Sequence, residues 1–384
     1  MMGGLGPAPF SAMLLADLGA DIVRVDRVDE VGAPLPGDAV LRRSQRSIAI
    51  DAKSERGRDV IRSLADRADA FVDVFRPGVA ERLGIGPDDL LARNRRLVYA
   101  RMTGYGQDGP LAQAPGHDIN YLALSGALHA IGTADAPVPP LNIIGDYGGG
   151  MLLAIGLLSG ILDARRSGTG QVVDVAMLDG AIAQMAFFYG MLAQGMWRDR
   201  RHANVLDGGA HYYRVYETAD GGHFSVGAIE RRFYDALCER LHVRVPHDEG
   251  NAESWEEHGR SIAARFRERS RADWETELTS TDACATPVLS LSEAPQHPHN
   301  VARRNFVEVA GVVQPAPTPR FSRTPASLPG NPAICGDSTV SLLRSLGLSA
   351  DTIDGLLQDG VARQSEVPAS ARPATSLDDG DGQR

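Results

Sequence analysis

The strongest constraint on the fold is an alternation of two patterns along the first 180 residues. Short apolar runs rich in β-branched residues predict strands at 22–25, 47–51, 70–75, 97–102 and 171–176. Segments with helical periodicity predict helices at 10–18, 54–67, 87–94, 117–131, 147–165 and 179–195. Strands that alternate with helices build βαβ units, so the pattern predicts a Rossmann-like α/β domain with a mostly parallel sheet.

A second, smaller α+β domain is predicted beyond residue 200, where the pattern changes. The turn Asp220-Gly-Gly separates two strand-like runs at 212–217 and 223–227, which is typical of a hairpin. Helical segments follow at 231–241 and 255–278. We therefore expect a large domain at 1–185, a small domain at 200–310, a linker and helices returning to the large domain at 311–370, and a disordered tail at 371–384.

Composition narrows the classes of function. A formal net charge of −10 disfavours a nucleic-acid partner, because such binding requires clustered cations. The most apolar stretch, 151–162, is shorter than the ~20 residues of a membrane span, so none is expected. Cys238, Cys284 and Cys335 lie too far apart for a zinc site or a disulfide framework. This cysteine usage favours a reducing, cytoplasmic compartment.

The first candidate for chemistry is the start of the predicted helix at 117–131. Pro115 and Gly116 end the preceding loop, which places His117 and Asp118 at or beside the helix N-terminus. The partial positive charge there favours neutral imidazole, the form that accepts a proton, and the unpaired amides could hold an oxyanion. The alternative is that Asp118 simply caps the helix and His117 is a loop histidine.

Asp146 and Glu230 are two further candidates. Asp146 also falls at a helix start, where the dipole favours a carboxylate, and the glycines around it permit close approach of a ligand. The order G-x-G-x-x-G is absent, so a dinucleotide site is not expected. Glu230 follows the predicted strand at 223–227 and could orient His117 and stabilise its cation. From spacing alone, a plain cap and a surface carboxylate remain the alternatives.

Many ordered stretches over residues 5–330 give the chain a family resemblance. The large-domain stretches are G-P-A-P-F-S-A-M-L-L-A-D-L-G-A-D-I-V-R-V-D-R at 6–27, F-R-P-G-V at 75–79, L-V-Y-A-R-M-T-G-Y-G-Q at 97–107, G-H-D-I-N-Y at 116–121 and P-L-N-I-I-G-D-Y-G-G-G at 140–150. The others are L-D-G-G-A at 206–210, V-G-A-I-E-R-R-F-Y at 226–234 and T-D-A-C-A-T-P-V-L at 281–289. On these residues the chain resembles the class III CoA-transferase superfamily, and within it the α-methylacyl-CoA racemases.

The resemblance implies a two-base proton transfer at the α-carbon of a 2-methylacyl-CoA thioester. His117 and Asp146 would serve opposite faces of a planar enolate, with Glu230 beside the histidine and Asn142 near the aspartate. The amide of Asp118 is the expected donor to the enolate oxygen. This chemistry requires no metal and no cofactor, since CoA is part of the substrate.

The resemblance also implies a CoA site and an assembly. The expected CoA-binding residues are Arg27, Ala49, Ile50, Asp51, Ala52, Arg76, Gly116, Ile119, Asn120 and Tyr121. The local basic cluster of Arg42, Arg43, Arg46 and Lys53 is the candidate for the CoA phosphates, with a solvated basic loop as the alternative. The family fold is an interlocked homodimer that combines the large domain of one chain with the small domain of the other.

Two alternatives to racemisation stay open. In class III CoA transferases the aspartate matching Asp146 is a nucleophile that forms a mixed anhydride. His117 favours racemisation, because the transferases lack a histidine in this context; a non-catalytic acyl-CoA binder is the third choice. Family members also begin with a strand ahead of the loop at 3–7, so we expect that the start at Met1 is misplaced.

Overall fold

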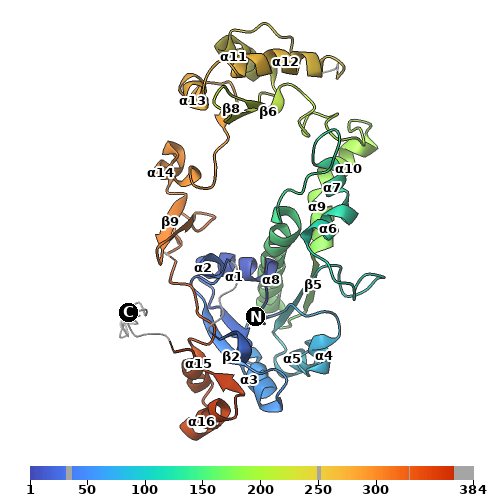
Figure 1. Cartoon of the computed structure of the whole chain (residues 1–384). Helices are drawn as coiled ribbons and strands as arrows, with labels where there is room; N and C mark the ends of the chain where they lie inside the picture. Colours follow the sequence, from blue (N-terminus) through green and yellow to red (C-terminus); the bar gives the residue numbers. More distant parts are fainter. Residues whose placement is uncertain (32–36, 249–251, 328, 367–384) are drawn as a thin grey trace. The chain divides into compact units, whose positions relative to one another are not determined.

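The computed structural model describes residues 1–31, 37–248, 252–327 and 329–366 (Figure 1). The chain divides into two compact units. Unit 1 comprises residues 1–116, 145–180 and 304–384, and unit 2 comprises 117–144 and 181–303. The predicted large domain therefore differs from unit 1, because 117–144 and 181–185 cluster with the small domain and the chain returns at 304. The predicted tail at 371–384 lies outside the described residues.

Unit 1 contains two three-stranded sheets joined by the first residues of the chain. One has the order β1-β2-β11, with β11 antiparallel, and the other is the parallel sheet β3-β4-β5. The strands are β1 (Val23–Asp26), β2 (Arg46–Ile50), β3 (Ala70–Asp73), β4 (Val98–Thr103), β5 (Val172–Ala176) and β11 (Ala362–Arg363). Met2 pairs in parallel with Val25, and its N–H donates to Val72 O at 2.9 Å. The prediction of an α/β fold with a parallel sheet is confirmed.

The helices of unit 1 cover the sheets through two apolar clusters. They are α1 (Pro7–Asp17), α2 (Asp38–Leu41), α3 (Glu55–Ala65), α4 (Val79–Arg82), α5 (Pro87–Arg93), α8 (Gly148–Ser167), α15 (Thr339–Ser345) and α16 (Ala350–Gln358), with the short η1 (Val28–Glu30). Ile48 and Ile50 of β2 share one cluster with Leu342 and Leu343 of α15. The end of the chain therefore packs beside its first third, as the red helices next to β2 and α3 show (Figure 1).

Helix α8 packs unusually close to its neighbours because of its glycines. A β-carbon on Gly150 would lie 2.6 Å from Pro7 O, and one on Gly160 would lie 2.8 Å from a methyl group of Val98. Gly150 at the start of α8 thus lets α1 approach the helix backbone, and Gly160 in the middle of α8 does the same for β4. By length and composition alone, the helical stretch Ile143–Ser167 could cross a membrane, although core helices of soluble proteins meet the same criterion.

Unit 2 contains an antiparallel sheet covered by helices, and a group of helices from the middle of the chain. The sheet has the order β6 (Tyr213–Glu217), β7 (His223–Gly227), β8 (Ala285–Pro287). The helices are α6 (Asp118–Ser125), α7 (Ala127–Ala130), α10 (Ala186–Ala193), α11 (Arg231–Leu241), α12 (Trp255–Phe266), α13 (Arg271–Leu278) and α14 (Pro298–Arg303), with η3 (Ala294–Gln296). Helix α9 (Met177–Gln184) begins in unit 1 and ends in unit 2.

The structure interrupts three of the predicted helices. The helix expected at 117–131 breaks at Gly126, whose φ of 81° lies in the left-handed region that glycine adopts without strain. The helix expected at 179–195 divides at Met185, and the one expected at 255–278 ends at Phe266 before Ser270 caps α13. A hairpin of β9 (Phe306–Val309) and β10 (Val312–Pro315) spans the boundary between the predicted small domain and the predicted linker, and it was not predicted.

Candidate functional site

Asp146 lies in a π-helical turn, η2 (Ile143–Tyr147), directly ahead of α8. Gly6 is its neighbour, since a β-carbon on Gly6 would lie 3.4 Å from Asp146 Oδ2. Tyr147 makes an edge-on contact with Phe10 of α1, with ring centroids 4.9 Å apart. The glycine loop that starts α1 and the turn that starts α8 therefore contact each other, and they hold the half-buried carboxylate between two helix N-termini.

Three of the predicted CoA-binding positions follow the carboxyl ends of parallel strands. Arg27 follows β1, Asp51 follows β2, and Arg76 lies three residues after β3. In α/β sheets this edge is where ligands bind, because the loops there are free to vary. The side chains of Arg27, Lys53 and Arg76 are exposed, whereas Ala49 and Ile50 are buried within β2. Of the segment 49–53, only Asp51, Ala52 and Lys53 are therefore accessible at the surface.

The basic cluster divides into buried and exposed members. The Arg42 guanidinium is buried and pairs with Asp26 at 3.4 Å and with Asp38 at 2.8 Å. Arg43 is also buried, and its Nε and Nη2 donate hydrogen bonds to the two carboxylate oxygens of Asp17. Neither side chain is solvated, and neither presents its charge at the surface. Among the four predicted phosphate ligands, only Arg46 and Lys53 are exposed, and Arg46 pairs with Asp21.

His117 is the N-cap residue of α6 in unit 2. Its backbone N–H donates to Asn120 Oδ1 at 3.0 Å, and its imidazole makes no capping hydrogen bond. The imidazole is exposed, whereas the next residue, Asp118, is buried in the first turn together with Tyr121. Asn120 therefore fixes the backbone of His117 at the helix start, while the ring stays exposed. His117 belongs to unit 2 and Asp146 to unit 1.

Glu230 is the N-cap residue of α11, and its carboxylate is exposed. Its backbone oxygen accepts hydrogen bonds from Phe233 and Tyr234 at 2.9 and 3.0 Å. Glu230 also lies near Cys284, which the sequence did not predict. Burial, followed by the charge of Glu230, raises the pKa of the Cys284 thiol. Throughout the described residues of this chain, no hydrogen bond or ion pair joins Glu230 to His117. Asn142 lies half-buried one residue ahead of η2.

A surface cavity of about 170 Å³ lies at the opposite edge of the sheet β3-β4-β5. It is lined by Asp66, Arg67, Ala68, Asp69, Asn94, Arg96, Ile161, Ala164 and Arg165, which precede β3 and β4 or end α8. None of the predicted site residues contributes to it. Within the ranges that the structure describes, no three His, Cys, Asp or Glu side chains are grouped to hold a metal ion.

The structure defines an α/β protein with a parallel sheet. Exposed basic residues at the carboxyl edge of the sheet, an Asp beside a glycine loop and a His at a helix N-terminus are features typical of proteins that bind ligands. Comparison with known proteins then identifies its family. The model of "CoA-transferase family III" matches residues 1–338, and the chain belongs to that family.

Several characterised proteins are similar to this chain over nearly its whole length. It is 40% identical to the α-methylacyl-CoA racemase of Mus musculus, over 96% of this chain and 97% of that protein. The identity to the Homo sapiens α-methylacyl-CoA racemase is also 40%, with the same two coverages. A crystal structure of a CAIB/BAIF family protein from Brucella suis has the same fold, with a TM-score of 0.77 and 22% identity over 90% of this chain and 97% of that one.

Proposed function

We propose that the protein racemises 2-methylacyl-CoA thioesters by moving the α-proton between His117 and Asp146. The observation that carries this proposal is His117 at the N-terminus of α6, with its ring exposed and uncommitted to capping. The similarity to two α-methylacyl-CoA racemases over nearly the full chain supports it. Because the substrates are branched acyl thioesters, the proposed reaction belongs to lipid metabolism.

The proposed reaction balances one proton taken against one proton returned. Neutral His117 accepts the α-proton from one face of the substrate, and the electron pair left on carbon moves into the thioester to form an enolate. Protonated Asp146 then donates a proton to the opposite face, which inverts the centre. In the reverse direction the ionised Asp146 is the base and the imidazolium of His117 is the acid.

A thioester α-proton is only weakly acidic, so the enolate oxygen requires stabilisation. The amide of Asp118 is the proposed donor, because it lies in the first turn of α6, and the N–H groups at a helix N-terminus point toward a bound anion. The helix dipole adds a partial positive charge at the same point. In other enzymes the loss of one such donor costs about 10²–10³ in rate.

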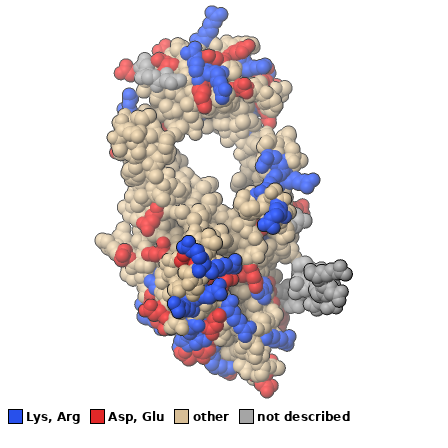
Figure 2. Space-filling view, turned by 180° about the vertical axis from the view of Figure 1, so that it is seen from behind, with Lys and Arg blue, Asp and Glu red and all other residues tan. Residues whose placement is uncertain are grey.

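We further propose that the working unit is a homodimer in a reducing, cytoplasmic compartment. Helix α10 has no fully buried residue, and Phe187, Tyr189 and Leu192 on it are large and exposed. The visible surface over α6, α7, α9 and α10 also carries few charged side chains (Figure 2). A second copy is the proposed cover, and its Glu230 would then supply the carboxylate beside His117. The three cysteines are unpaired, which suits a reducing compartment.

A single enantiomer of a 2-methylacyl-CoA in D₂O tests the proposal. We expect the optical activity to disappear as deuterium enters the α-position. In His117→Ala and in Asp146→Asn, the rate of deuterium uptake should fall by a factor of about 10²–10⁴. His129→Ala is the control, because His129 is an exposed histidine in the same unit. Transfer of CoA to an added carboxylic acid, with a mixed anhydride trapped at Asp146 by hydroxylamine, would establish the transferase reaction instead.

A further inference from the structure

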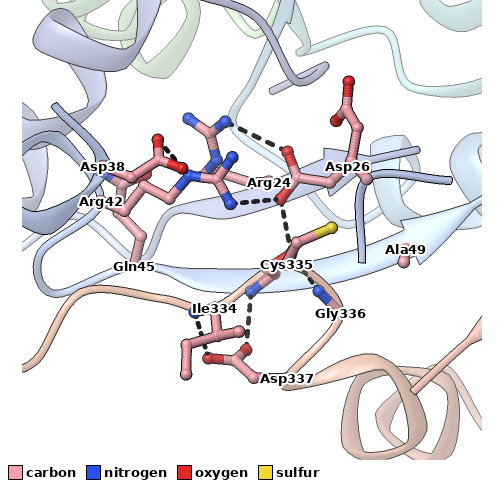
Figure 3. A network of polar contacts seen from close by, with 12 residues as sticks. Arg24, Asp26, Asp38, Arg42, Gln45, Ala49, Ile334, Cys335, Gly336 and Asp337 are labelled. Carbon is pink, nitrogen blue, oxygen red and sulfur yellow. Dashed lines mark hydrogen bonds and ion pairs between the residues drawn. The ribbon is translucent and has the colours of Figure 1, made fainter. Parts of the chain in front are cut away.

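The polar network centred on Asp26 joins the carboxyl end of β1 to a segment near the end of the chain. Asp26 is buried, and its carboxylate accepts hydrogen bonds from Arg24 at 3.2 Å and from Ser47 Oγ at 2.6 Å. Arg42 contacts the same carboxylate at 3.4 Å, so two guanidinium groups converge on it (Figure 3). Because Arg42 also pairs with Asp38, the two positive charges are balanced by two carboxylates.

Ser47 of β2 relays this network to residues 333–339, which we call the brace. Its hydroxyl accepts from Gly336 N at 2.8 Å, its backbone N–H donates to Asp337 Oδ1 at 3.4 Å, and its carbonyl accepts from Ser338 N at 2.9 Å. Asp337 also accepts from Ile334 N at 2.9 Å, which closes the turn of the brace (Figure 3). The brace therefore makes hydrogen bonds to the side chain, the N–H and the carbonyl oxygen of Ser47 in β2.

Thr339, at the end of the brace, bonds directly to the predicted CoA segment. Its hydroxyl oxygen accepts a hydrogen bond from Ala49 N at 3.0 Å across 290 residues of sequence, and lies 2.8 Å from Arg363 O of β11. Thr339 and Ala49 are both fully buried. A buried N–H without an acceptor costs more than an ordinary hydrogen bond contributes, so this contact strongly constrains Ala49.

The brace also leaves no room for β2 to shift. Gly336 has a φ of +76°, and a β-carbon on it would lie 2.9 Å from Arg363 O and 3.1 Å from the β-carbon of Ala49. Directly after the adjacent strand β1, the carbonyl oxygen of Arg27 accepts a hydrogen bond from the Cys335 thiol at 3.7 Å. Beyond Ala49, the N–H of Asp51 donates to Val361 O at 2.8 Å. Cys335 and Val361 near the end of the chain thus contact Arg27 and Asp51, which belong to the two predicted CoA-binding segments after β1 and β2.

From this geometry we infer that Thr339 is a positioning residue for CoA binding, acting through the backbone of residues 49–53. This inference rests on the proposed function, since it assumes that CoA binds at this edge of the sheet. Thr339 itself touches no ligand, because it is fully buried. Its role is to hold the strand end from which Asp51, Ala52 and Lys53 reach the surface, so its loss weakens binding and leaves the proton transfer at His117 and Asp146 unchanged.

The test compares Thr339→Val with Thr339→Ser in the full chain. Valine keeps the shape and removes the acceptor for Ala49 N, so we expect coenzyme A to bind about 5–20-fold more weakly in calorimetry. The KM for acyl-CoA should rise by a similar factor while kcat stays within about twofold. Serine keeps the hydroxyl and should restore both values. Amide exchange at residues 49–53 should quicken in the valine variant alone.

Ser349→Ala is the matched control. Ser349 caps α16 by accepting from Thr352 N, so its loss destabilises the same C-terminal segment without touching β2. If Thr339→Val proves unfolded, Asp337→Ala provides the second variant, because it removes the contact of the brace to Ser47 N at a half-buried position. Wild-type affinity for coenzyme A in a folded Thr339→Val or Asp337→Ala chain would overturn the inference. Failure of the wild-type chain to bind coenzyme A would instead refute the proposed function.

Discussion

Gly6 and Asp146 are neighbours in space although 140 residues separate them in sequence. Gly6 is the N-cap residue of α1, with a φ of 68° and a ψ of −115°, and a β-carbon there would lie 3.4 Å from Asp146 Oδ2. This backbone conformation is one that residues other than glycine adopt only at a cost of about 1–3 kcal/mol. The glycine loop thus allows the backbone of α1 to start beside the proposed acid–base group.

Gly6→Ala should lower the rate of α-deuterium uptake by at least about tenfold, because the added methyl group would lie in van der Waals contact with the Asp146 carboxylate and a small displacement of substrate from a reacting group is costly. Gly19→Ala is the matched control. Gly19 also has a positive φ, of +97°, but nothing lies within 4 Å of the point that a β-carbon would occupy there. Equal loss of activity in both variants would show that backbone strain, and not the contact with Asp146, is responsible.

Asp17→Ala should destabilise unit 1 by about 3–5 kcal/mol, because it leaves the Arg43 guanidinium buried without its carboxylate. Both side chains are 1% exposed, and Arg43 also donates to Gln314 Oε1 at 2.8 Å and to Pro315 O at 2.7 Å. Urea denaturation measures the loss. In Asp21→Ala the exposed partner Arg46 stays solvated, so the change should remain below about 1 kcal/mol. Similar losses in the two variants would contradict this account.

The stability of unit 2 should fall as the pH decreases from about 6.5 to 4. His211 is fully buried, and burial, followed by the nearby His258, lowers its pKa to about 4. The unfolded chain therefore binds a proton more readily in this range, which removes about 3 kcal/mol of stability in total. Trp197, Trp255 and Trp274 all lie in unit 2, so tryptophan fluorescence reports its unfolding.

His211→Gln should flatten this pH dependence, because glutamine has no proton to gain, and it keeps a donor for Pro246 O, which lies 3.1 Å from His211 Nε2. His223→Gln, at an exposed position in β7, should leave the pH dependence unchanged. An undiminished slope in the His211 variant would assign the titration to another group.

Phe187→Glu should convert a dimer into monomers in sedimentation velocity. The side chain belongs to a residue that is 61% exposed on α10, and burying a phenylalanine contributes about 1.5–3 kcal/mol. A two-fold interface contains the residue twice, so the dissociation constant should rise by at least about 100-fold. Leu291→Glu changes a residue that is 96% exposed outside these helices and should not alter assembly. A monomeric wild-type chain would refute the proposed dimer.

Local pattern was sufficient for most of the fold. Every strand of the first 180 residues lies within two residues of its predicted bounds, because β-branched apolar runs and helical periodicity act locally. The breaks at Gly126 and Met185 were missed, since a helix can continue through either residue unless its neighbours require a turn. The short strand β11 was also missed: it has only two residues, and its pairing with β2 joins Ala362 to Ile50 from opposite ends of the chain.

For the candidate site, the sequence predicted the positions of the residues but not their burial. His117 at a helix start, Asp146 ahead of α8 and Glu230 after β7 follow from the sequence, because each depends on where a helix begins. Burial was beyond the sequence: Arg42 and Arg46 have the same chemistry and neighbouring positions, yet only Arg42 is buried, between Asp26 of β1 and Asp38 of the preceding helix.

By itself, then, the sequence determined the order of strands and helices, the family and the residues available for acid–base chemistry. The tertiary structure alone decided that Gly6 lies beside Asp146, that Arg43 is a buried partner of Asp17, and that Thr339 holds Ala49. The physical reason is that helix starts and strands follow from short-range periodicity and capping, whereas these contacts join residues 26 to 290 positions apart and exist only when the sheet and its helices pack together.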